Sequence, residues 1–101
     1  MIYGISYNIL AVNVNRRPLT SGQIRAARAF LRWRAEDLAR ESSVGVATIR
    51  RAELADSETS MTMPNDLALR RALEAAGIEF IDDNGRGPGV RLRKSKRTKK
   101  Q

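Results

Sequence analysis

The chain has 101 residues, of which 19 are Lys or Arg and 11 are Asp or Glu, giving a formal net charge of +8. It contains no Cys and no His, which excludes disulfides, thiolate or imidazole catalysis and the usual zinc sites. The length favours one domain, and no apolar run approaches the roughly 20 residues of a membrane-spanning helix, so we expect a soluble, cytoplasmic protein.

Residues 1–18 are an N-terminal extension for which the sequence leaves two structures open. Tyr3, Ile5, Tyr7 and Ile9 recur at every second position, which is the spacing of a strand. Gly, Ser and Asn residues interrupt this pattern, so a poorly ordered extension is the alternative.

A first helix is predicted over 21–33. Thr20 and Gln23 have the spacing of a capping box, and Leu19 and Ile24 occupy the two hydrophobic-staple positions around it. The apolar residues of one buried stripe follow at helical spacing: Ile24, Ala27 and Leu31. The residues expected on the solvated side are Arg25, Arg28 and Arg32.

Two short helices are predicted next, over 35–42 and 46–54, with the uncharged segment SSVGV as the turn between them. Glu36 and Asp37 lie in the first turn of the earlier helix, where the helix dipole favours negative charge. The residues expected to fill the angle between the two helices are Leu38, Ala39, Val44, Ile49 and Ala52.

A fourth helix is expected to begin near Pro64 and to end at Gly77, which suits a left-handed cap. Arg70 and Arg71 are expected on its solvated side. Residues 78–93 then read as a β-hairpin, because IEFI and VRLR flank the turn-rich segment DDNGRGPG.

The C-terminal segment 94–101 is predicted to be a disordered basic tail. All 11 acidic residues precede residue 86, and the 11 arginines there balance them, so the whole positive excess lies in 86–101. A polyanion is the natural partner of such a tail, and its predicted DNA phosphate contacts are Lys94, Lys96, Arg97, Lys99 and Lys100.

The helix over 46–54 carries the candidate binding face. Its inner positions are needed for packing, which leaves Ala47, Thr48, Arg50 and Arg51 on the outside. An α-helix fits the major groove of B-DNA, and arginine matches the paired acceptors of guanine. This pattern predicts that the helix reads DNA.

The segment EDLARESSVGVATIRRAE, residues 36–53, resembles the phage-repressor-like helix-turn-helix proteins of the XRE class, with features that include the closing Glu53. With the flanking helices the resemblance covers about residues 19–77. It implies a mostly α, lambda-repressor-like bundle of four to five helices, here followed by the hairpin and the tail. It also implies base contacts from Val46, Ala47, Arg50 and Arg51, and a phosphate near Thr48.

Three positions depart from the pattern of that class. Arg34 stands where a Ser or Thr cap is usual, and is expected to contact phosphate through its charge. Ser43 stands where the turn commonly has Gly, and a left-handed backbone there would cost about 1 kcal/mol. Gly45 replaces the polar cap of the following helix and supplies no side-chain acceptor.

We therefore expect a sequence-specific transcriptional regulator that binds double-stranded DNA, as a homodimer on a palindromic operator. The alternative is a protein-interaction module, such as an antitoxin or antiactivator, that docks through residues 1–18 or 78–93. RNA binding by the tail is a weaker possibility, since five aromatic residues offer no stacking platform. We expect no enzyme activity, cofactor or metal, because the acids are dispersed without a nucleophile or ligand set.

Overall fold

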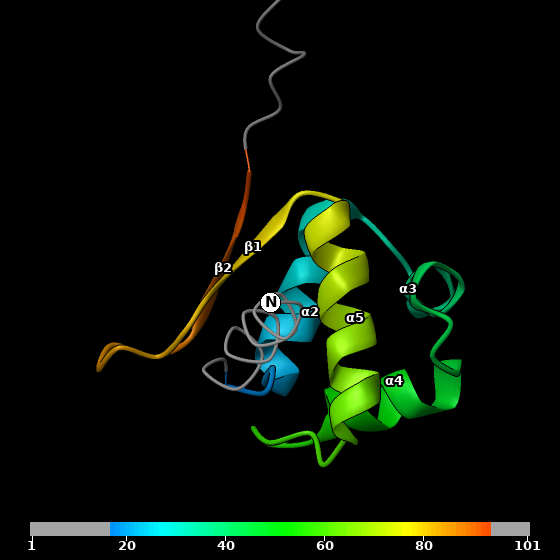
Figure 1. Ribbon diagram of the computed structural model, residues 1–101, viewed down its shortest axis with the longest axis horizontal. Coiled ribbons are helices and arrows are strands. Elements are labelled where there is room, and N and C mark those ends of the chain that lie inside the picture. Colours follow the sequence, from blue (N-terminus) through cyan, green and yellow to red (C-terminus); the bar gives the residue numbers. More distant parts are fainter. Residues whose placement is uncertain (1–16, 94–101) are drawn as a thin grey trace, which may run out of the picture.

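A computed structural model describes residues 17–93 of the chain. Within these residues the fold is mostly helical, with four helices followed by a two-stranded antiparallel hairpin (Figure 1). The helices are α2 (Ser21–Leu31), α3 (Ala35–Ser42), α4 (Val46–Leu54) and α5 (Met63–Ala75), and the strands are β1 (Ile78–Ile81) and β2 (Gly89–Leu92). The predictions for residues 1–16 and 94–101 fall outside the described residues.

The predicted start of α2 is confirmed, and its predicted end is wrong by two residues. Thr20 and Gln23 form the capping box, with the Gln23 amide donating to Thr20 Oγ1 at 3.1 Å and Gln23 Oε1 accepting from the Thr20 amide at 3.0 Å. The helix ends at Leu31 because Arg32 adopts a left-handed conformation, with φ of 58°. The chain then turns through Trp33 into α3.

One apolar core joins the four helices to the hairpin. Its fully buried members come from every helix, from β1 and from the residues just before α2, and the largest are Leu19, Ile24, Leu38, Ile49, Leu69, Leu73 and Ile78. The residues predicted to fill the angle between α3 and α4 belong to this core or pack against it. The amphipathic spacing therefore identified the inner faces of the helices.

The predictions made from Pro64 at the start of α5 and from Gly77 after its end are both confirmed. Pro64 lies in the first turn, after Thr62, whose hydroxyl caps the helix by accepting from the Asn65 amide at 3.3 Å. Gly77 follows the last helical residues with φ of 113°, in the left-handed region that favours glycine. The positive φ lets the chain reverse directly into β1.

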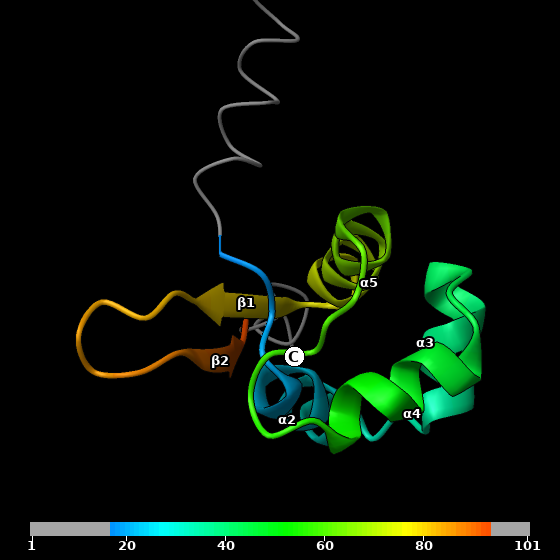
Figure 2. The ribbon, with the colours of Figure 1, turned by 90° about the horizontal axis from the view of Figure 1, so that it is seen from below.

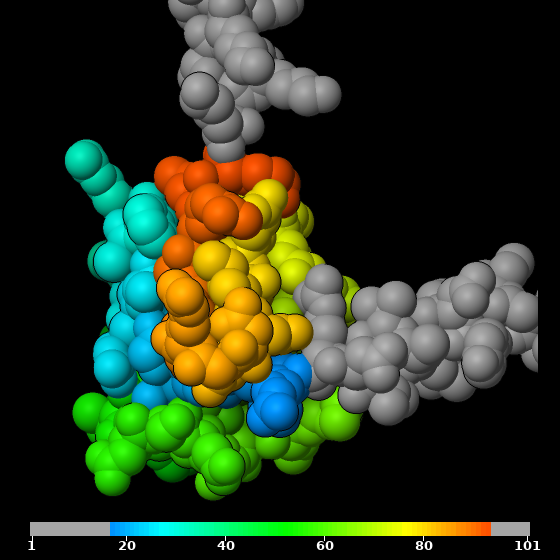
Figure 3. All heavy atoms as spheres, turned by 90° about the vertical axis from the view of Figure 1, so that its left-hand side faces the viewer, coloured from blue at the N-terminus to red at the C-terminus, as the bar shows by residue number. Residues whose placement is uncertain are grey.

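The hairpin packs as a unit against α2 and α5. Its register pairs Ile78 with Leu92 and Phe80 with Val90, so these four residues share one face of the two strands. Phe80 and Val90 pack against the core. In Figures 1 and 2 the hairpin lies on one side of the pair α2 and α5, and α3 lies on the opposite side. Figure 3 shows the hairpin spread over its face of the molecule.

None of the helices in 17–93 combines the length and the apolar character that a membrane span requires.

Candidate nucleic-acid interface

The connection between α3 and α4 is three residues long and is held by Ser42. The Ser42 hydroxyl donates to the Leu38 carbonyl at 2.7 Å and accepts from the Val44 amide at 3.1 Å. Ser43 adopts a left-handed backbone, with φ of 63°, at the position where the XRE class commonly has Gly, and its amide donates to the Ala39 carbonyl at 2.8 Å. Val44 is buried, so the turn is anchored to the core rather than loose.

The faces of α4 separate into a packed side and an outward side. Ile49, Ala52 and Glu53 are buried, whereas Arg50 and Arg51 are exposed. This places both predicted base-reading arginines on the outward side.

The three other α4 residues predicted to contact DNA differ in exposure. Ala47 is exposed, and Thr48 is half-buried. Val46 is half-buried and packs against the core at the start of the helix. The exposed residues of α4 are therefore Ala47, Arg50, Arg51 and Leu54.

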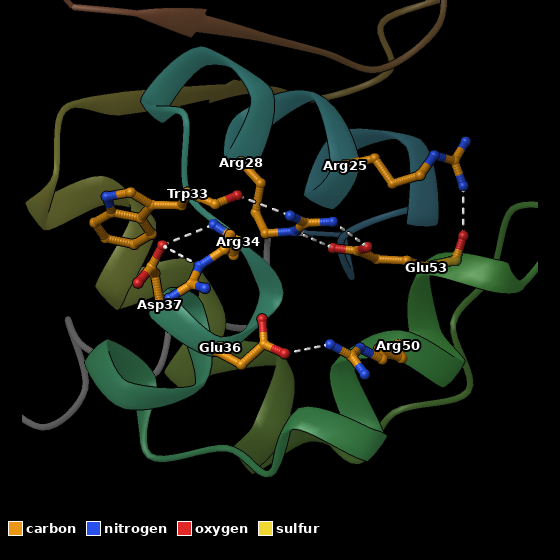
Figure 4. Close-up of polar contacts among 8 residues, drawn as sticks. All are labelled: Arg25, Arg28, Trp33, Arg34, Glu36, Asp37, Arg50 and Glu53. Carbon is orange, nitrogen blue, oxygen red and sulfur yellow. Dashed lines mark hydrogen bonds and ion pairs between the residues drawn. The ribbon is translucent and has the colours of Figure 1, made fainter.

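An ion pair between Arg28 of α2 and Glu53 of α4 fixes the orientation of α4 (Figure 4). Arg28 Nε lies 2.7 Å from Glu53 Oε2, and Arg28 Nη2 lies 2.7 Å from Oε1. The side chains are 22% and 9% exposed. The hydrogen bond to Glu53, followed by the charge of Glu53, raises the pKa of Arg28 above its ordinary value despite the burial.

Two further bonds complete this anchor. Arg28 Nη1 donates to the Trp33 carbonyl at 2.8 Å, which ties the chain between α2 and α3 to the same guanidinium. Arg25 Nη1 donates to the Glu53 carbonyl at the end of α4. The prediction of Arg28 as a solvated residue is therefore wrong, while Arg25 and Arg32 are exposed as expected.

The position of Arg28 in the sequence could have predicted that it is not fully solvated. Arg28 follows Ile24 by four residues, so on a helix it lies along the edge of the apolar stripe rather than opposite to it. An arginine at that edge needs an acid from a neighbouring element, and Glu53 supplies it. Only the fold, which brings residues 25 positions apart together, identifies the partner.

The two outward arginines of α4 have different neighbours. Arg50 Nη2 forms an ion pair with Glu36 Oε2 in the first turn of α3. Arg51 Nη2 instead approaches the hydroxyl of Thr48, one turn earlier on α4, at 3.4 Å. Among the described residues no carboxylate pairs with Arg51.

The beginning of α3 lies beside the α4 face. The pKa of Glu36 is lowered, first by its own backbone amide and then by the charges of Arg50 and Arg34. Asp37 Oδ2 accepts from the Arg34 amide at 2.8 Å, and this bond, with the one from Arg40, lowers the pKa of Asp37. The Arg34 side chain, a predicted phosphate contact, is 76% exposed.

A shallow cleft of about 390 Å³ adjoins α4 on its other side. Its lining includes Thr48 and Arg51 from α4, Thr59 and Thr62 from the segment that leads into α5, and Asn65 from the first turn of α5. Hydroxyl, amide and guanidinium groups are all suitable donors to a phosphate oxygen. The cleft therefore adds hydrogen-bond donors to the polar surface around Arg51.

The tail residues predicted to contact phosphate, Lys94 to Lys100, lie outside the described residues. Within 17–93 no group of three or more acidic residues is arranged to hold a metal ion. The candidate interface of the described chain is thus the outward side of α4 with the start of α3.

Comparison with known proteins identifies no relative: no family model, curated protein or solved structure matches this chain. The resemblance to the XRE class accordingly stays a prediction from the sequence.

Proposed function

We propose that this protein binds double-stranded DNA in a sequence-specific manner and regulates transcription, with α3 and α4 as a helix-turn-helix unit and α4 in the major groove. The observation that carries the proposal is the outward pair Arg50 and Arg51 on a short helix whose opposite side is buried and ion-paired to α2. A helix held in this way presents its side chains in a fixed direction.

The physical match is between guanidinium groups and base edges. The major groove admits an α-helix, and guanine presents N7 and O6 there as two adjacent acceptors. Arginine donates to both at once, and such a pair discriminates against a wrong base by about 1–3 kcal/mol. Ala47, which is small and exposed, would allow the start of α4 to approach the bases closely.

Backbone contacts would supply affinity and orientation. The phosphate contacts would be Arg34, whose charge acts on Glu36 as that of Arg50 does, and Thr48, which lies beside Arg51, and the cleft beside Arg51 offers further donors. The basic tail would add affinity for any duplex, because lysines and arginines near phosphate release condensed counterions.

Two copies on a two-fold symmetric operator would give useful specificity, since one helix contacts only a few base pairs. The hairpin over 78–93 and the extension over 1–18 are the proposed contacts between the copies, because an uncovered strand edge can pair with another chain.

Alanine substitutions test the assignment. Arg50→Ala and Arg51→Ala are each expected to weaken binding to a preferred duplex by roughly 1–3 kcal/mol, with a smaller loss on a random duplex. Arg71→Ala is the matched control, since it removes the same charge from an exposed position on α5. Titration of labelled duplexes measures both affinities.

Equal losses on preferred and random DNA for Arg50→Ala and Arg51→Ala would contradict base reading by α4. A loss in Arg71→Ala as large as in the α4 variants would show that only total charge matters.

A further inference from the structure

The two adjacent arginines of α4 differ in their charge partners, because Glu36 forms an ion pair with Arg50 and not with Arg51. The Glu36 carboxylate reaches from α3 to Arg50, 14 residues away in the sequence, and the pair sits at the surface with side chains 50% and 56% exposed (Figure 4). Arg51 has only the neutral hydroxyl of Thr48 close to its guanidinium among the described residues. Arg51 thus offers an uncompensated charge, whereas the charge of Arg50 is compensated.

The negative charge of Glu36 affects the approach of Arg50 to a phosphate and to a base edge differently. A phosphate oxygen brought to Arg50 also comes close to the Glu36 carboxylate, and the two negative groups repel each other. A guanine edge carries neutral acceptors, so the same approach brings no such repulsion. Arginine has five N–H donors, and those not used by Glu36 can still point at N7 and O6.

The surroundings of Glu36 keep its carboxylate ionised and in place. Its own backbone amide in the first turn of α3 interacts with it, and Arg34 and Arg50 add positive charge nearby. Negative charge is favourable at the N-terminal end of a helix. The carboxylate therefore does not depend on Arg50 alone for its position.

We propose that Glu36 is a specificity-determining residue, which withholds Arg50 from the DNA backbone and leaves it available to a base edge. The proposal rests on the DNA binding proposed above. Arg50 then contributes almost only to recognition of the preferred duplex, whereas Arg51 can contact a phosphate as well as a base edge.

The test compares Glu36→Gln with Glu41→Gln. Glu41 is an equally suitable acid on α3, 51% exposed and 3.8 Å from Arg40, so both substitutions remove one negative charge from the same helix. Each variant is titrated with a duplex that wild-type protein selects from a random pool and with an unselected duplex, over a range of salt concentrations.

Glu36→Gln is expected to bind the unselected duplex about twofold to fivefold more tightly than Glu41→Gln, the range of a solvent-exposed ion pair. Its binding should also depend more steeply on salt, by about one additional phosphate contact. The ratio of selected to unselected binding should fall. In an Arg50→Ala background the difference between the two glutamine variants should disappear.

Two results would overturn the inference while leaving the proposed function intact. One is an equal change in unselected binding for Glu36→Gln and Glu41→Gln. The other is a loss on the selected duplex with no gain on the unselected one, which would make Glu36 a residue that only positions Arg50. If wild-type protein prefers no duplex at all, the proposed function fails, and this inference fails with it.

Discussion

Arg28 and Glu53 join α2 to α4 through an ion pair. Their ion pair is bidentate and largely shielded from water, and the same guanidinium also holds the Trp33 carbonyl. A charge in such a place needs its partner, because the cost of removing it from water is otherwise uncompensated.

Glu53→Ala is expected to lower the free energy of unfolding by about 2–3 kcal/mol, since Arg28 would keep its charge without its main partner. The double variant Arg28→Met with Glu53→Met should recover most of this loss, because it removes both charges and keeps apolar contact. Glu41→Gln, at the surface, should change stability by less than about 0.5 kcal/mol. Urea unfolding measures all three, and a loss that persists in the double variant would contradict the ion-pair account.

A second buried polar group links the start of the described chain to α5. Asp66 is 7% exposed, and its Oδ1 accepts from the Leu19 amide at 2.9 Å. Arg70 is 4% exposed, donates to the Arg17 carbonyl at 2.7 Å and lies 5.3 Å from the Phe80 ring centroid. The prediction of Arg70 as a solvated residue is therefore wrong, while Arg71 is exposed as expected.

The pH dependence of stability should reveal Asp66. Burial raises the pKa of Asp66, and the Leu19 amide and Arg70 only partly offset it. The Asp66 carboxyl group therefore binds a proton more tightly in the folded chain than in the unfolded chain. Its contribution to stability rises as the pH falls toward 3.8, the ordinary pKa of an aspartate. Wild-type protein should gain stability relative to Asp66→Asn when the pH is lowered from 7 to 4.

Asp83→Asn provides a comparison of opposite sign. The amides of Gly85 and Gly87 lower the pKa of Asp83, so its contribution is present at neutral pH and is lost as the pH falls below its ordinary value. Wild-type protein should lose stability relative to this variant over the acid range. The same sign of change for both substitutions would contradict the assignment of Asp66.

At the scale of elements, Gln23 joins α2 to the hairpin. Its Oε1 completes the capping box, while its Nε2 donates to the Gly89 carbonyl at 3.0 Å and to the Ile81 carbonyl at 3.3 Å. The sequence predicted the capping box, which depends on residues three positions apart. It could not predict the second role, because the two carbonyls lie 58 and 66 residues further along the chain.

Gln23→Glu separates these two roles. A glutamate keeps the acceptor for the Thr20 amide but turns a carboxylate toward two carbonyl oxygens, so we expect a loss of about 1–3 kcal/mol. Amide hydrogen exchange should speed up in β1 and β2 and change little in α2. Thr62→Ala, which removes the cap of α5, should cost about 1 kcal/mol and leave hairpin protection unchanged. Unchanged hairpin exchange in Gln23→Glu would contradict the link.

Features of the fold that depend on residues close together in the sequence could be predicted, and contacts between distant residues could not. The helices, the left-handed Gly77 and the hairpin depend on neighbours within a few positions, and these predictions hold apart from the end of α2. Helical spacing also identified Ala47, Arg50 and Arg51 as outward residues of α4, but it did not identify the exposed Leu54. The sequence did not reveal the partners of Arg28, Arg50 and Arg70, because these depend on how distant elements meet.

For the whole molecule, the uneven distribution of charge leads to a prediction about the tail. The chain up to Gly85 is electrically balanced, and the excess of +8 follows it. Removal of residues 94–101 should weaken binding to preferred and random duplexes by the same factor and make both less dependent on salt. Titration at several salt concentrations measures this, and a loss confined to the preferred duplex would contradict a nonspecific role for the tail.

Selection of bound duplexes from a random pool tests the central claim most directly. Wild-type protein is expected to enrich one motif with two inverted halves about one helical turn apart, and Arg50→Ala is expected to relax the choice of base at a fixed position in each half. A pool that stays random after repeated rounds, while the protein remains folded, would contradict DNA recognition by α4.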